Sequence, residues 1–188
     1  LQVPTFNFHE GKPEYLGNTL KLEPDQVVVI EGIHALNPRL TAHIPAAHKF
    51  RVFVNALTQL KLDPNNRLST TDLRLIRRIV RDFSHRSHNA VRTLEMWPSV
   101  RAGEKRWIYP FQQEADATFN SSLDYELAVL KSYAEPLLHA VKPTMEVYGE
   151  ARRLQDFLSL IVGASPDPVP PQSLLREFIG GSMYEEDA

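Results

Sequence analysis

Between residues 73 and 88 the segment LRLIRRIVRDFSHRSH alternates apolar and basic positions with the period of a helix. At about 100° per residue, one side of that helix is apolar and is formed by Ile76, Ile79, Val80 and Phe83. The opposite side is cationic and is formed by Arg74, Arg77, Arg78 and Arg81. The pattern therefore predicts an amphipathic helix with one core face. The cationic face is open to two interpretations, because such faces are usually solvated, whereas a bound anion is the alternative.

Two apolar runs precede this helix and predict strands. The run VVVIEG, Val27 to Gly32, is continuous and β-branched, which is typical of a strand buried on both faces of a parallel sheet. The run FRVFVN, residues 50–55, alternates and then enters the polar loop LDPNNRLSTTD. That loop ends in three residues that are competent helix caps, Thr70, Thr71 and Asp72.

The second half of the chain predicts further helices. In SSLDYELAVLKSYAEPLLHAV, Ser121 and Asp124 have the spacing of a capping box, and Pro136 is expected to kink or divide the helix. A short strand TMEVY, an amphipathic helix ARRLQDFLSLIV and a short helix LLREFIGG follow. Alternating strands and helices predict an α/β fold with a mostly parallel sheet. The expected domain covers residues 1–163, and residues 164–188 form a proline-rich connector, a short helix and an acidic tail.

Composition narrows the functional classes. The 188 residues are 43% hydrophobic and 23% charged, which is typical of a globular domain, and no apolar run approaches the ~20 residues that cross a bilayer. The absence of cysteine excludes a disulfide scaffold and thiolate chemistry, and it fits a cytoplasmic protein without a membrane partner. The formal net charge of −2 argues against a nucleic-acid partner, so the positive charge of the arginine helix is local.

A carboxylate closes the first predicted strand. Glu31 followed by Gly32 at the carboxyl end of a parallel strand suits a position that holds hydrated magnesium beside a phosphate chain, although a helix cap or an ion-pair partner is the alternative. Together, a strand-end carboxylate and an arginine face are the parts that phosphoryl transfer requires. The phosphate-cradling pattern G-x-x-x-x-G-K-[ST] does not occur in the sequence.

Other candidate chemistry is weaker. His85 and His88 have helical spacing, but no cysteine or well-spaced acid completes a metal site. The aromatic residues from Trp97 to Phe111 interleave with basic residues, as in a single-strand nucleic-acid platform, yet packing at the base of a lid or a contact between subunits is the preferred interpretation. A homo-oligomer is left open, and no G-x-S-x-G nucleophile pattern is present.

Several segments in order resemble the uridine kinase and phosphoribulokinase family of P-loop kinases. They are VPTFNF, VVVIEGIHAL, FRVFVN, RRIVRDFSHRSH and YPFQQEADATFN, within about the first 150 residues. Later segments resemble a bacterial branch of uridine-kinase-like nucleoside kinases that often carry extra domains before the kinase. The resemblance implies a three-layer P-loop kinase-like α/β fold whose N-terminal part is missing, because the family's P-loop and catalytic aspartate lie before the position of Leu1. Activity of this chain alone is therefore doubtful.

The resemblance also implies roles for individual residues. Glu31 aligns with the glutamate that helps to hold Mg2+, Arg78 with an arginine that reaches the nucleoside, and Arg81 with an arginine on the phosphate side. A lid over ATP would run from residue 83 to about residue 92, with Arg86 as one lid arginine and His88 in the position of a second. The catalytic candidates are thus Glu31, Arg81 and Arg86.

The nucleoside pocket departs from the family pattern. Phe6 and Phe8 keep the stacking surface but lose one hydroxyl, and Asn7 replaces an aspartate. The position of a base-contacting histidine falls near Gly11, and that of a base-reading glutamine near Met96. Because a polar site discriminates through such hydrogen bonds, these changes weaken the assignment of uridine or cytidine as acceptor.

The sequence therefore predicts an ATP-dependent and Mg2+-dependent kinase that phosphorylates a nucleoside or a similar small hydroxyl compound. Two alternatives stay open. One is a non-catalytic module whose arginine face binds RNA or an anionic partner, and the other is a structural domain of a larger enzyme.

Overall fold

A computed structural model describes residues 5–7 and 12–184, and it divides into two compact units, Leu1–Ala35 and Leu36–Ala188. The first unit contains a short antiparallel hairpin, in which β1 (Thr5–Asn7) pairs with β2 (Lys12–Glu14). Thr5 lies opposite Glu14 in this hairpin. Each unit is described by itself below, and the site lies in the second.

The predicted strand at Val27–Gly32 is wrong for this structure. The segment is irregular, and Val27 and Val29 are each 88% exposed. A β-branched run becomes a strand only where a neighbouring strand supplies ladder hydrogen bonds and other elements bury its side chains. Among the described residues of the first unit, the two strands of the hairpin pair with each other and leave this run without a ladder. Glu31 therefore lies in an exposed, non-regular segment.

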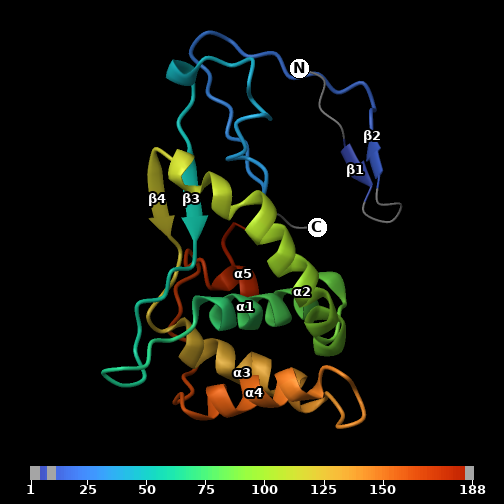
Figure 1. Cartoon of the computed structure of the whole chain (residues 1–188), viewed down its shortest axis with the longest axis vertical. Helices are drawn as coiled ribbons and strands as arrows, with labels where there is room; N and C mark the ends of the chain where they lie inside the picture. The colour runs from blue at the N-terminus through green and yellow to red at the C-terminus, as the bar shows by residue number, and fades with distance from the viewer. Residues whose placement is uncertain (1–4, 8–11, 185–188) are drawn as a thin grey trace. The chain divides into compact units, whose positions relative to one another are not determined.

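The second unit begins with a short 3₁₀ helix, η1 (Ala46–His48), and contains a parallel strand pair, β3 (Val52–Asn55) and β4 (Ala117–Asn120). Val52 lies opposite Ala117, and Figure 1 shows the two arrows side by side. The strand predicted from FRVFVN and its parallel pairing are thus confirmed. A parallel pair needs a long crossover, and here the crossover carries the two longest helices.

The arginine helix is confirmed as α1 (Thr70–Arg86). Its N-cap is Ser69, whose side chain accepts a hydrogen bond from the Asp72 backbone N–H at 3.2 Å, so the predicted caps Thr70, Thr71 and Asp72 lie inside the helix instead. The difference arises because the helix starts at the first residue after Ser69, which leaves the serine hydroxyl beside the free N–H groups of the first turn.

The predicted core face of α1 is confirmed except at Phe83. Ile76, Ile79 and Val80 are fully buried, whereas Phe83 is 54% exposed. In the last two turns of the helix the buried position falls to Asp82, which is turned inward and held by polar partners described below. The apolar stripe therefore ends one turn earlier than the spacing predicts.

Four helices and a 3₁₀ segment complete the unit (Figure 1). They are α2 (Ala90–Trp107), η2 (Tyr109–Glu114), α3 (Glu126–His139), α4 (Tyr148–Ser159) and α5 (Arg176–Ile179). Helix α1 packs against α2, α3 and α5, and α4 packs on α3. Leucine is the most frequent residue in the core between them, which includes Leu75, Leu130, Leu138, Leu154 and Leu158.

Three smaller predictions about the second half need correction. Helix α3 begins at Glu126, and Ser121 lies before it. Pro136 does not divide α3, because the helix continues to His139. The predicted TMEVY strand is a turn that leads into α4, since a short alternating run without a partner strand gains no ladder hydrogen bonds. Within the described part of the chain, every helix is too short or too polar to cross a lipid bilayer.

Candidate functional site: the arginine pocket

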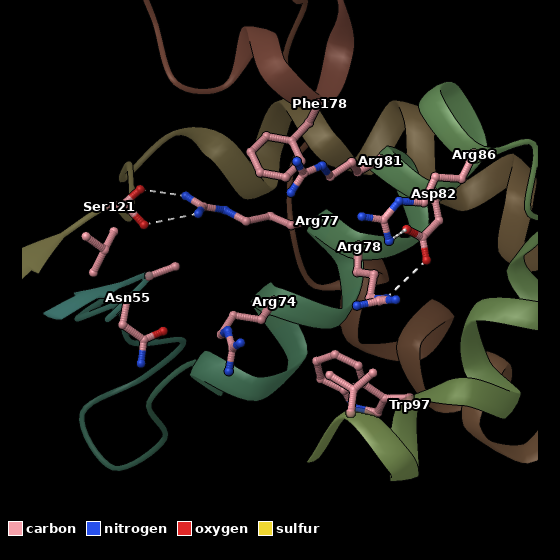
Figure 2. Close-up of a pocket in the computed structure, with 13 residues that line it drawn as sticks. Asn55, Arg74, Arg77, Arg78, Arg81, Asp82, Arg86, Trp97, Ser121 and Phe178 are labelled. Carbon is pink, nitrogen blue, oxygen red and sulfur yellow. Dashed lines mark hydrogen bonds and ion pairs between the residues drawn. The ribbon is translucent and has the colours of Figure 1, made fainter. Parts of the chain in front are cut away.

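A pocket of about 250 Å3, here called the arginine pocket, opens along the cationic face of α1 (Figure 2). Its walls come from the end of β3, from α1 and α2, from the residue after β4 and from α5. The lining residues are Val54, Asn55, Ala56, Arg74, Arg77, Arg78, Arg81, Asp82, Arg86, Trp97, Val100, Ser121 and Phe178. Asn55 and Ser121 mark the carboxyl ends of the two parallel strands, which is where α/β proteins bind their ligands.

Asp82 is a buried acceptor for several parts of the pocket. Its carboxylate accepts hydrogen bonds from Arg78 Nε at 3.1 Å, from Arg86 Nη1 at 3.1 Å and from the Thr93 hydroxyl at 3.2 Å. Its backbone carbonyl accepts from the N–H groups of Ser87 and His88, and Ser87 takes a left-handed conformation with φ of 53°. The residue therefore fixes two pocket arginines and the turn between α1 and α2 at once.

Arg77 is held rigidly at the junction with β4 and α3. It pairs with the buried Glu126 at 2.5 Å and donates to the Ser121 carbonyl oxygen at 2.6 Å, a contact visible in Figure 2. Its guanidinium carbon also lies 5.2 Å from the centre of the Phe178 ring, which is cation–π distance. With so many partners, Arg77 belongs to the framework of the pocket.

Arg74 belongs to a second buried network, centred on Glu104. Glu104 pairs with Arg74 and also accepts from Arg101 Nη1 at 2.6 Å, while Arg101 donates to the Tyr109 hydroxyl at 2.8 Å. Burial alone lowers the pKa of Arg101, but the hydrogen bonds to Tyr109 and Glu104 outweigh it and raise that pKa above its ordinary value. This network accounts for part of the aromatic and basic segment that the sequence left open.

The charges around the pocket do not balance. Asp82 forms ion pairs with both Arg78 and Arg86, and Glu104 forms ion pairs with both Arg74 and Arg101. Arg77 and Arg81 each have one carboxylate partner of their own. Arginines therefore outnumber the carboxylates that pair with them, so the pocket keeps a positive surplus that favours an anionic ligand.

The predicted site residues are brought together only in part. Arg78, Arg81 and Arg86 line one pocket, whereas His88 lies beside it without lining it. Glu31 belongs to the first unit, whose position relative to the pocket is not determined. Phe8 lies outside the described residues, and Phe6 is described only as a backbone position of β1.

The sequence missed several residues of the pocket. Trp97 and Phe178 supply aromatic walls, and Ser121 anchors Arg77. Asp82 is the single acid among the six arginines between residues 74 and 92, and that isolation is the available sequence signal for its role. No pattern in the sequence indicates Phe178, because it reaches the pocket from the far end of the chain.

Metal-binding groups are sparse in the described residues 5–7 and 12–184. No cluster of three or more histidine, cysteine, aspartate or glutamate side chains with metal-ligand geometry occurs among them. A kinase magnesium ion usually takes only one or two carboxylates and completes its shell with water and phosphate oxygens, so one exposed glutamate such as Glu31 fits this donor chemistry.

The family comparison agrees with this geometry. Residues 1–128 match the phosphoribulokinase/uridine kinase family, and because this is more than half of the chain, the chain belongs to that family. Members are P-loop kinases that use ATP to phosphorylate a small substrate, and the helices with a small parallel sheet fit an α/β fold of this type. Comparison with curated proteins and with solved structures gave no match.

Proposed function

We propose that this chain forms the acceptor-binding and phosphate-binding part of a kinase that transfers a phosphoryl group from ATP to a nucleoside or a similar small hydroxyl compound. The observation that supports this most is the arginine pocket at the carboxyl ends of β3 and β4, with its surplus of arginines over carboxylates. Phosphoryl transfer depends mainly on positioning and on cations around the transferred group.

The proposal gives the pocket arginines different tasks according to their exposure. Arg81 and Arg86 are about half exposed, at 46% and 47%, so their guanidinium groups can reach phosphate oxygens. The partner of Arg81 is itself half exposed, and Asp82, the buried partner of Arg86, keeps its contacts with Arg78 and Thr93. Arg78 is less exposed and lies deeper beside Trp97, which suits contact with the acceptor. Arg74 and Arg77 stay paired with buried glutamates and shape the pocket.

The remaining assignments extend the proposal to residues outside the pocket. Glu31 would contribute one ligand to Mg2+, which when bound neutralises charge on the phosphate oxygens of ATP. Phe6 and Phe8 would offer stacking surface to the acceptor, and His88 would approach ATP from the turn between α1 and α2. The expected lid from residue 83 to about residue 92 spans the end of α1 and the start of α2.

The RNA-binding alternative is less well supported by the pocket. A surface that binds nucleic acid presents unneutralised arginines and lysines to the phosphate backbone. Here four carboxylates pair with the pocket arginines, and the surplus charge lies in a pocket of small-molecule size.

Replacing Arg81 in the full-length protein tests the proposal. Loss of one preorganised cationic donor to a transition state lowers kcat by about 10²- to 10³-fold, and we expect Arg81→Ala to do so in an assay of ADP release with ATP and a panel of nucleosides. Arg152→Ala is the matched control, because Arg152 forms a similarly exposed ion pair with Asp156 on α4. Turnover of Arg81→Ala equal to that of the control would remove Arg81 from the site.

A further inference from the structure

The last helix contributes to the arginine pocket although it lies beyond residues 1–128, the part that matches the family. Two consecutive residues of α5 contact arginines of α1. The Glu177 carboxylate pairs with Arg81 Nη2 at 2.8 Å, and the Phe178 ring lines the pocket beneath Arg77. The C-terminal segment thus contacts Arg81, which the proposed function assigns to phosphate, and Arg77, which shapes the pocket.

The backbone of α5 is firmly anchored. Phe178 and Leu175 belong to the buried core, and the Arg176 guanidinium donates to the Val169 carbonyl oxygen at 2.5 Å. His85 Nε2 lies 2.9 Å from the Glu177 carbonyl oxygen, which adds a contact to α1. The main chain at Glu177 is therefore held against α1 within ion-pair reach of Arg81, and only its side chain is free to change rotamer.

Among the carboxylates that pair with arginines of the pocket, Glu177 differs in its exposure and lies outside the pocket lining. The side chains of Asp82, Glu104 and Glu126 are 1% to 3% exposed, whereas that of Glu177 is 49% exposed. When a buried carboxylate separates from its arginine, an unpaired charge stays buried, and its desolvation penalty is no longer offset. An ion pair between two half-exposed groups is weak, because water solvates both groups when they separate. Among the described carboxylates that pair with arginines of the pocket, Glu177 is thus the one most easily displaced from its arginine.

We propose that Glu177 is an exchangeable counter-ion that sets the affinity of the arginine pocket for phosphate. Without ligand, the Glu177 carboxylate forms an ion pair with Arg81. When a polyphosphate binds, a phosphate oxygen replaces the carboxylate as the partner of the Arg81 guanidinium. The exchange weakens anion binding at Arg81 by the strength of the displaced ion pair. This inference rests on the proposed function, because it assumes that Arg81 binds phosphate.

The test is Glu177→Gln in the full-length protein, with inorganic tripolyphosphate as the probe and calorimetric titration as the readout. Glutamine keeps the shape and one acceptor oxygen but removes the charge. Displacement of a half-exposed ion pair corresponds to a factor of about two to five in affinity, so Glu177→Gln is expected to bind tripolyphosphate about two- to five-fold more tightly than the parent. Asp156→Asn, which removes the same charge from an exposed arginine pair on α4, is expected to change the affinity less.

A second background separates exchange at Arg81 from a general charge effect. In Arg81→Ala protein, adding Glu177→Gln is expected to give no further gain, because the arginine that both anions share is gone. An equal gain in both backgrounds, or no gain in either, overturns the inference. If Arg81→Ala binds tripolyphosphate as well as the parent does, the proposed function fails at Arg81 as well. If that variant binds more weakly while Glu177→Gln is unchanged, only the inference on Glu177 fails.

Discussion

Replacing Asp82 by alanine is expected to destabilise the second unit strongly, although the residue is charged and lies on a cationic helix face. The side chain is fully buried and accepts hydrogen bonds from Arg78, Arg86 and Thr93. Alanine removes all three acceptor contacts together. The buried Thr93 hydroxyl is then left without its partner, and the two arginines lose the carboxylate that they share.

The size of the effect follows from the exposure of the partners. An unsatisfied buried hydroxyl costs about 1–3 kcal/mol. Arg78 and Arg86 are 26% and 47% exposed, so water screens their pairs with Asp82, and each contributes only about 0.2–1 kcal/mol. Together these give a loss of about 1.4–5 kcal/mol in the free energy of unfolding. For a chain of this length that corresponds to a fall in Tm of roughly 3–20 °C.

Urea unfolding and thermal unfolding, both followed by far-ultraviolet circular dichroism, measure this loss. Asp156→Ala is the control, because it removes an exposed aspartate from an arginine pair and is expected to change stability by less than about 0.5 kcal/mol. Asp82→Asn keeps the shape and one acceptor oxygen, so its loss is expected to fall between the two. A loss in Asp82→Ala no larger than that of the control would refute the role of Asp82 as a shared buried acceptor.

Two further predictions concern the start of α1 and the strand pair. Ser69→Ala is expected to lower the free energy of unfolding, measured in urea, by about 1 kcal/mol, because the N-cap hydrogen bond from the Asp72 N–H is lost. Thr71→Ala, inside the helix, is expected to lower it by less. Equal losses in the two variants would contradict the capping assignment. The hydrogen bond from the Arg51 side chain, with further help from the Arg51 N–H at 2.7 Å, lowers the pKa of Asp116 below its ordinary value of 3.8. The stabilisation from the ionised carboxylate is therefore present above about pH 4 and is lost as the pH falls through the lowered pKa. Between about pH 6 and about pH 3, the urea midpoint of unfolding is expected to fall less in Asp116→Asn than in the parent. Parallel curves for the two proteins would contradict this.

Hydrophobic periodicity in the sequence correctly predicted α1 and β3, two elements that also find packing partners nearby in the second unit. The helical period of residues 73–88 predicted α1 and its cationic face, and the alternation of FRVFVN predicted β3. Both elements also find partners in the second unit, which the pattern alone does not supply. The run Val27–Gly32 has an equally clear strand pattern, but it has no ladder partner among the described residues and stays irregular.

The pocket itself was predictable only on its α1 side. The arginine stripe identified Arg74, Arg77, Arg78 and Arg81, because residues on one helix face are close whatever the rest of the fold does. Arg86 was indicated by the family resemblance. Phe178 and Glu177 come from nearly 100 residues further along the chain, and their contact with α1 depends on how α5 packs. The inward turn of Asp82 depends on Thr93 of α2, which the sequence of α1 does not reveal.

A structure of the full-length protein with a non-hydrolysable ATP analogue, Mg2+ and a nucleoside tests the central claim most directly. The account predicts phosphate oxygens within hydrogen-bond distance of the guanidinium groups of Arg81 and Arg86, with the Glu177 carboxylate moved away from Arg81. Phosphates bound elsewhere, with Arg81 still paired to Glu177 and Arg86 still paired to Asp82, would contradict it.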